Sequence, residues 1–337
     1  MRRTIQTHIK RALQRMGIYI KYYSNAEHLY QHLQNKHQKI KEYEIKHITK
    51  EVALVQDHKF YDAFIKLYIP SWDVNYQKAL FFGKGIGESS LDSYRKIKIN
   101  EQYFYEKIYF NNYSELNTIL WFGENVAPLL SEDIKTASPD LIFKGKDLTV
   151  LYFPFLELNV IPNKRLESKL IEFSKKLYNI SNDENIHNLE KKASDNLKNF
   201  QNHFLYQRNK KIAEENFHKY GIDFVEIEKT IENSRKILTH GDLNEGNGFE
   251  ESVLIDWDSF GIFPLGLEAA YLYYRIHLRG DKIIDYKQWV KQHYSDIIHA
   301  QEWGLFKKNY TYFLFVFTCK LFPAHSVLKE QLIQALK

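Results

Sequence analysis

The stretch that begins HGDLNEGN at His240 and ends LIDWD constrains the chain more than any other part of its sequence. It places Asp242, Asn247 and Asp256 within a short distance along the chain. The apolar run at 252–257 predicts a strand that ends near Asp256. The glycines before it predict a loop, because glycine adopts backbone angles that other residues resist. A loop and a returning strand should therefore bring these three oxygen-bearing side chains together.

These residue types suit the transfer of a phosphoryl group. That reaction needs a carboxylate to orient a hydroxyl nucleophile and oxygen ligands to hold magnesium on the phosphates. Magnesium usually takes only one or two carboxylates from the protein. The spacing therefore predicts Asp242 as the catalytic base, with Asn247 and Asp256 as the magnesium ligands.

The segment also resembles the catalytic segment of the aminoglycoside phosphotransferase and choline kinase family, small-molecule relatives of the protein kinases. The family pattern is H-G-D-[LIV]-x-x-x-N, followed by a hydrophobic strand that ends I-D-[WF]-[DE]. The chain matches this pattern at His240, Gly241, Asp242, Leu243, Asn247, Ile255, Asp256, Trp257 and Asp258.

The resemblance implies an α+β, two-lobed protein-kinase-like fold with a mixed β N-lobe and a helical C-lobe. It also implies ATP and Mg²⁺, the same roles for the three side chains above, and His240 as an organiser of the loop. The family usually has an aspartate after the next Gly/Pro turn, where this chain has Leu267 or Glu268. We expect an N-terminal helical extension over 1–75, a nucleotide-binding N-lobe over 76–157 and a helical catalytic C-lobe over 158–337.

A glycine-rich segment upstream is the candidate phosphate-binding loop. The sequence ALFFGKGIGESS runs from an apolar strand into Gly83, Gly85, Gly87 and Ser89, whose main-chain N–H groups could approach phosphate oxygens. No helix pattern follows. Two alternating segments, 94–100 and 103–110, predict strands instead. This order argues against a Rossmann or Walker unit and favours a kinase N-lobe.

The third strand of that lobe should carry a lysine for the α- and β-phosphates. Lys107 lies inside YFYEKIYF and is the first candidate, with Lys98 and Lys66 as weaker ones. In the resembled family a helix glutamate pairs with this lysine. Glu115 stands in the first turn of a helix predicted to begin near Ser114. It could instead only complement the helix dipole, and Glu124 is the rival partner.

The segments 141–143 and 148–155 predict a hairpin, with Phe155 and Leu156 at the link between the lobes, where adenine would lie. Downstream, apolar spacing predicts helices, and Gly261, Pro264 and Gly266 predict a break in regular structure. The helical segments are expected over 163–177, 185–204, 209–217, 268–277 and 298–322.

Charge and composition narrow the acceptor class. The formal net charge of +5 disfavours a polycationic acceptor and is compatible with an anionic sugar or an envelope glycan or lipid precursor. No nucleic-acid-binding motif is recognised, so nucleic acid is not expected as a partner. A small-molecule or sugar hydroxyl is therefore the expected acceptor. A non-catalytic, nucleotide-binding pseudokinase scaffold and a nucleotidyl transferase on the same fold are the alternatives.

The single cysteine, Cys319, fits a reducing compartment, and no secretory signal peptide is recognised, so a cytoplasmic location is expected. The first 16 residues give an apolar helical face with basic residues around it. This helix could contact an anionic membrane at its inner face, or it could pack on the N-lobe with its basic side in solvent. Both interpretations remain open at this point.

Overall fold

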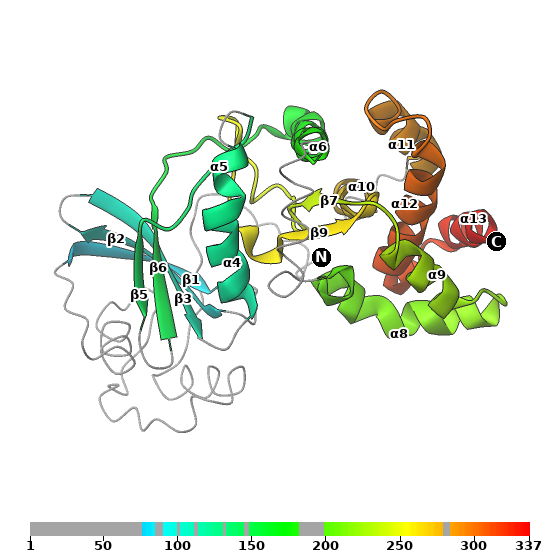
Figure 1. Cartoon of the computed structure of the whole chain (residues 1–337), viewed down its shortest axis with the longest axis horizontal. Coiled ribbons are helices and arrows are strands. Elements are labelled where there is room, and N and C mark those ends of the chain that lie inside the picture. Colours follow the sequence, from blue (N-terminus) through cyan, green and yellow to red (C-terminus); the bar gives the residue numbers. More distant parts are fainter. Residues whose placement is uncertain are drawn as a thin grey trace, which may run out of the picture. The chain divides into compact units, whose positions relative to one another are not determined.

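The computed structural model describes residues 76–84, 90–99, 102–110, 114–130, 133–144, 148–181, 199–278 and 284–337. These residues fall into two compact units (Figure 1). The first comprises Met1–Leu116 and Ala137–Glu157, and the second comprises Asn117–Thr136 and Leu158–Lys337. The expected helical extension over 1–75 lies outside the described residues. One limit expected from the sequence, after residue 157, coincides with a boundary between the units, whereas 117–136 cluster with the second unit.

A five-stranded sheet forms the described part of the first unit, in the order β1-β2-β3-β6-β5. Every described pairing in it is antiparallel, whereas a mixed sheet was expected. Short connections, such as those at 85–89, 100–101 and 145–147, favour antiparallel neighbours. The strands are β1 (Tyr76–Lys84), β2 (Ser90–Ile99), β3 (Gln102–Phe110), β5 (Leu141–Lys144) and β6 (Leu148–Pro154).

The helix α4 (Ser114–Asn125) follows β3 and begins at the serine that the sequence indicates. Its later part belongs to the second unit, where the Phe122 ring stacks on Trp257 with the ring centres 4.3 Å apart. After α5 (Ala127–Leu130), the strand β4 (Lys135–Thr136) pairs in parallel with β8 (Val253–Leu254). Both α4 and α5 are seen in Figure 1.

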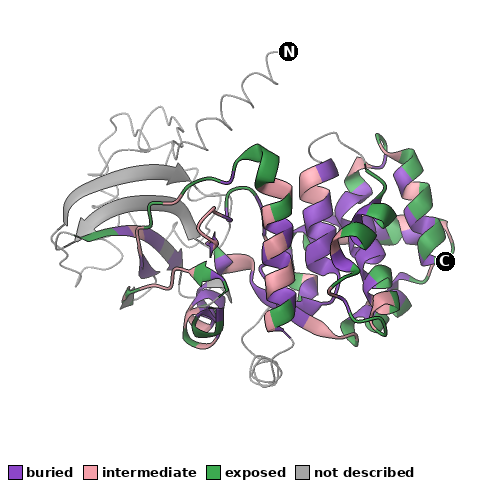
Figure 2. Ribbon diagram, turned by 90° about the horizontal axis from the view of Figure 1, so that it is seen from above, coloured by how far each residue is buried: buried purple, intermediate pink, exposed green. Residues whose placement is uncertain are grey.

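The second unit is mainly helical, and its buried residues gather inside the helix cluster (Figure 2). The helix α12 is its centre, because it packs against α8, α10 and α13 and every residue of Tyr310–Thr318 is buried. The helices are α6 (Asn163–Ile180), α8 (Phe204–Lys219), α9 (Phe224–Glu232), α10 (Leu267–Tyr273), α11 (Tyr286–Tyr294), α12 (Trp303–Thr318) and α13 (Ser326–Leu336). In the described part of the chain, no helix is both long enough and apolar enough to cross a bilayer.

Several sequence expectations about element limits were wrong. Of the strand expected over 252–257, only β8 (Val253–Leu254) forms. Asp256 cannot continue it, because that residue is left-handed, with φ of 65°. The expected break after it contains β9 (Gly261–Pro264), which pairs antiparallel with β7 (Lys236–Thr239). Of the helix expected over 185–204, residues 185–198 lie outside the described residues, and the described end is a short 3₁₀ turn, Phe200–Asn202, followed by the extended residue His203. The helix expected over 268–277 ends as a π-helical turn, Tyr274–Leu278.

The α+β class, the β-rich first unit and the helical second unit are confirmed for the described residues. The order of three strands with a lysine on the third, a helix, a hairpin that completes the same sheet and then a helical unit is the order expected of a protein-kinase-like chain. The β5–β6 hairpin also lies where the sequence indicates it.

Candidate active site

The imidazole of His240 links the loop 240–247 to Ile255, the residue that follows β8. Its Nε2 lies 2.9 Å from the main-chain oxygen of Ile255, and its Nδ1 accepts the N–H of Asp242 at 3.3 Å. These contacts require the proton to be on Nε2. His240 is fully buried, and burial lowers its pKa to about 4, so the ring is neutral. The loop that carries Asp242 and the segment after β8 that carries Asp256 are therefore linked by one neutral side chain.

The backbone of Gly241 is held at both its N–H and its carbonyl group. Its N–H donates to Glu268 Oε2 at 3.2 Å, and its carbonyl lies 2.7 Å from His203 Nε2. Gly241 has φ of +78°, and a Cβ atom there would lie 2.1 Å from the carbonyl oxygen of Ser259. Only glycine fits, because both the left-handed backbone and the close approach exclude a side chain. The residue immediately before Asp242 is thus held by groups from two other elements.

After the Gly/Pro turn, where the resembled family usually has an aspartate, Glu268 is the residue whose side chain contacts the loop. Leu267 begins α10, but the Glu268 side chain is the one that supports the loop. It is 3% exposed. Burial raises its pKa to about 7, and the nearby Asp242 raises it further, while hydrogen bonds from the main chain of Gly241 and His240 oppose the change.

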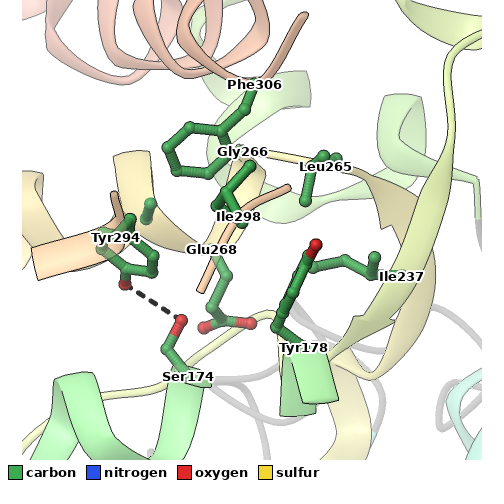
Figure 3. Close-up of a pocket in the computed structure, with 10 residues that line it drawn as sticks. Ser174, Tyr178, Ile237, Leu265, Gly266, Glu268, Tyr294, Ile298 and Phe306 are labelled. Carbon is green, nitrogen blue, oxygen red and sulfur yellow. Dashed lines mark hydrogen bonds between the residues drawn. The ribbon is translucent and has the colours of Figure 1, made fainter. Parts of the chain in front are cut away.

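A small cavity of about 10 Å³ lies beside Glu268. Figure 3 shows the carboxylate between Ser174 and Tyr178, with the hydroxyl of Tyr294 donating to Ser174 Oγ at 3.0 Å. Glu268 Oε1 is buried and has no hydrogen-bond partner among the described residues. A cavity of this size holds about one water molecule. It is therefore too small to bind a substrate.

The side chain of Asp242 is held by several donors. The hydroxyl of Tyr271 donates to Oδ1, and Asn244 Nδ2 donates to the same oxygen at 2.9 Å. Asn247 Nδ2 donates to the main-chain oxygen of Asp242 at 2.8 Å and lies 3.5 Å from Oδ2. Burial raises the pKa of Asp242 to about 6, and the charge of Asp256 adds to this, while the Tyr271 hydrogen bond lowers it. A carboxylate with a pKa close to neutral is suited to accept a proton.

Asn247 and Asp256 both lie near this carboxylate, because Asn247 donates to Asp242 and the charge of Asp256 raises the pKa of Asp242. The N–H of Ile255 donates to the main-chain oxygen of Asn247 at 3.0 Å, which joins the loop to the residue before Asp256. Because the amide nitrogen of Asn247 donates to Asp242, its Oδ1 is the atom that can ligate a cation. In the ranges that the structure describes, no three His, Cys, Asp or Glu side chains form a metal-binding group. One carboxylate and one amide oxygen suit magnesium, which keeps several of its waters.

The first unit contains the candidate phosphate lysine. Lys107 lies in β3 opposite Leu151 of β6, is 5% exposed, and has its Nζ 5.4 Å from the centre of the Tyr109 ring. A buried strand lysine is uncommon unless its charge is compensated. The neighbouring Glu106 is also fully buried and accepts a hydrogen bond from Tyr152 at 2.6 Å.

The remaining nucleotide-site candidates are described only in part. Gly83 lies in β1 at an irregularity in its pairing with β2. Gly85, Gly87 and Ser89 lie outside the described residues, and so does the side chain of Glu115, whose backbone is in the first turn of α4. The rival Glu124 is exposed. The pairing of Lys107 with either glutamate stays a prediction.

The proposed adenine segment follows β6 directly. The N–H of Phe155 donates to the main-chain oxygen of Tyr103 at 3.0 Å, and Leu156 is 39% exposed. Their role in binding adenine also stays a prediction.

Three residues near Asp242 were missed by the sequence analysis: His203, Tyr271 and Arg275. Tyr271 follows Glu268 by three residues in α10, which places both on one face of that helix. That spacing could have indicated Tyr271 as a second residue of α10 that faces the loop. His203 and Arg275 gave none, because their contacts with Gly241 and Glu245 join segments that are distant in the sequence.

No protein-family model matches the chain, and no curated protein sequence is detectably similar to it. Among solved structures, it is similar to the spectinomycin phosphotransferase APH(9)-Ia in complex with ADP and spectinomycin, at 12% identity, over 80% of this chain and 84% of that one, with a TM-score of 0.45. It is similar to macrolide 2′-phosphotransferase type I at 10% identity, over 82% and 96% of the two chains, with a TM-score of 0.45.

A third similar structure is the microcompartment-associated aminopropanol kinase, at 13% identity, over 79% and 91% of the two chains, with a TM-score of 0.43. All three similarities are at low sequence identity.

Proposed function

We propose that the chain is an ATP-dependent phosphotransferase that moves the γ-phosphoryl group of ATP to a hydroxyl of a small molecule or sugar. The observation that carries this proposal is the setting of Asp242. Its carboxylate is oriented by Tyr271 and Asn244, has a pKa raised to about 6, and adjoins Asn247 and Asp256. A base beside an oxygen-ligand pair is the arrangement that phosphoryl transfer needs.

In the proposed reaction, the acceptor hydroxyl oxygen forms a bond to the γ-phosphorus while the bond to the β–γ bridging oxygen breaks and ADP leaves. Asp242 accepts the hydroxyl proton. Asn247 Oδ1 and Asp256 would hold Mg²⁺, which supplies positive charge to the phosphate oxygens. Lys107 would contact the α- and β-phosphates, and Phe155 and Leu156 would adjoin adenine.

The test is turnover by the full chain with Mg-ATP and a panel of hydroxyl compounds, read by product mass. A product that carries one added phosphoryl group, together with ADP, supports the proposal. An added AMP group would identify nucleotidyl transfer, and ATP binding without any product would identify a scaffold.

Asp242→Asn should abolish turnover and leave ATP affinity nearly unchanged, because the base orients the acceptor rather than the nucleotide. The matched control is Asp296→Asn, which removes an exposed carboxylate that pairs with Lys175 and should keep turnover. Normal turnover in Asp242→Asn would reject the assignment of the base.

A further inference from the structure

Arg275 lies beside the proposed catalytic base. It belongs to the π-helical turn Tyr274–Leu278 that continues α10, four residues after Tyr271, whose hydroxyl donates to Asp242. The guanidinium is close enough to Asp242 for the charge of that carboxylate to act on the pKa of the arginine. Burial alone would lower that pKa, but Tyr271, Glu245 and Asp242 reverse the effect, and the pKa is raised. Arg275 is therefore a cation next to the position that the acceptor hydroxyl must take.

The ion pair of Arg275 with Glu245 is open to solvent on one side only. Arg275 Nη2 lies 2.9 Å from Glu245 Oε2, and the side chains are 16% and 49% exposed, respectively. The position of the arginine is thus fixed by its surroundings, whereas the glutamate lies at the rim. Pairs of this kind contribute little to stability when one partner is in water. An incoming anion can therefore replace Glu245 at low cost.

The guanidinium also has unused hydrogen-bonding capacity. Arginine carries five N–H donors in a planar fork, and the described contacts use only Nη2. Its Nε is buried and has no hydrogen-bond partner within the described ranges. A planar fork that is only partly used matches a carboxylate or a phosphate, which accept two parallel hydrogen bonds from arginine.

We propose that Arg275 binds an anionic group, a carboxylate or a phosphate, on the hydroxyl-bearing acceptor, and that Glu245 occupies this position until the acceptor binds. This inference rests on the proposed phosphotransferase function and adds the class of acceptor. Arg275 thereby selects acceptors that carry a negative charge near the reacting hydroxyl and disfavours those that carry an ammonium group there.

The experiment compares four acceptors that share a sugar ring: glucuronate and glucose 1-phosphate as anions, glucose as the neutral compound and glucosamine as the cation. We expect kcat/KM to be about tenfold or more higher for at least one anion than for glucose. The two anions distinguish a carboxylate from a phosphate ligand. Calorimetric binding of both anions is measured alongside, because it reports on Arg275 without requiring turnover.

Arg275→Gln should raise KM for the preferred anion about tenfold or more and change KM for glucose less than about threefold. Arg275→Lys keeps the charge without the planar fork, so its KM for the preferred anion should lie between those of wild type and Arg275→Gln. Glu245→Gln should lower KM for the anion, because it removes the competing carboxylate. Thermal melting and Mg-ATP affinity of each variant show whether the fold and the nucleotide site are retained.

A purely structural role of the Arg275–Glu245 ion pair predicts a different result. If the pair only holds the loop, Arg275→Gln and Glu245→Gln will impair all acceptors equally, and the inference is wrong. It is also wrong if the wild-type chain neither binds nor phosphorylates either anion. Should Arg275→Gln not fold, the opposite effects expected of Glu245→Gln and Arg275→Lys decide the question. Failure of the proposed function itself would appear separately, as the absence of any Mg-ATP turnover with every acceptor.

Discussion

Replacing Glu268 by glutamine should make the chain more stable at alkaline pH. The glutamate is 3% exposed, and only one of its carboxylate oxygens has a hydrogen-bond partner among the described residues. Glutamine has nearly the same shape, and its side-chain oxygen can still accept the N–H of Gly241. The substitution therefore removes a buried charge while it keeps the support of the catalytic loop.

The direction follows from the pKa of Glu268, which rises from 4.5 to about 7 on folding. Between these values the folded chain holds a proton that the unfolded chain has released. The contribution of this proton to stability is complete below about pH 4.5 and is lost as the pH rises through about 7. Above that pH, the wild-type chain must bury a carboxylate close to Asp242.

The size of the effect follows from about 1.4 kcal/mol for each pH unit by which the pKa is displaced. The displacement of Glu268 thus corresponds to about 3 kcal/mol, which is a large part of the 5–15 kcal/mol typical of a folded domain. The advantage of Glu268→Gln over wild type should grow by about 2–3 kcal/mol between about pH 5 and pH 8.

Unfolding in urea at a series of pH values measures this difference. The buried Trp257 and Trp289 report on the second unit through their fluorescence. Glu251→Gln is the control of opposite sign. Its pKa is lowered from 4.5 by a hydrogen bond from its own main chain and by others from Asn159, so wild type should lose its advantage over that variant only below about pH 4.5, and the difference should stay constant between about pH 5 and pH 8. If the difference in unfolding free energy between wild type and Glu268→Gln does not change with pH, Glu268 does not ionise in its buried position and the reasoning is wrong.

Three other outcomes are expected. Asp256→Ala should weaken Mg-ATP binding strongly and Asn247→Ala should raise the magnesium requirement, since both would supply oxygen ligands; unchanged magnesium dependence by calorimetry in both would reject these roles. Lys107→Met should cost more affinity for ATP than for adenosine, because the lost contact is with phosphate charge; equal losses would indicate a folding defect. Gly241→Ala should lower the melting temperature and turnover, because its backbone is left-handed and a Cβ would meet a main-chain oxygen at 2.1 Å. Gly246→Ala, whose Cβ would meet only a side-chain atom at 3.2 Å, is the matched control and should be affected less.

The sequence by itself determined the local elements around the site. Alternating residues set the strand β3 and place Lys107 within it, and Ser114, predicted as a helix start, is the first residue of α4. The two apolar runs on either side of KGKD predict a hairpin, and β5 and β6 pair antiparallel as expected. The HGD segment likewise predicts a loop that begins with a structural histidine, and His240 has that role in the structure. These features are predictable because neighbours within a few residues decide them.

The limits of the strands next to the site depended on the tertiary structure. The apolar run before Asp256 is too short to show where pairing stops, and only the left-handed backbone at that residue ends β8. Gly261–Pro264 was expected to break the chain but forms β9, because β7 offers it a partner edge. Pairing with a distant strand can override a local turn signal.

Only the tertiary structure decided which residues surround Asp242. The contacts from His203, Glu268, Tyr271 and Arg275 come from α10 with its π-helical turn and from the residue before α8, all distant from the loop along the chain. No local pattern encodes such contacts. They arise because packing of apolar faces, above all on the buried α12, fixes the helices in place and so brings these polar side chains to the loop.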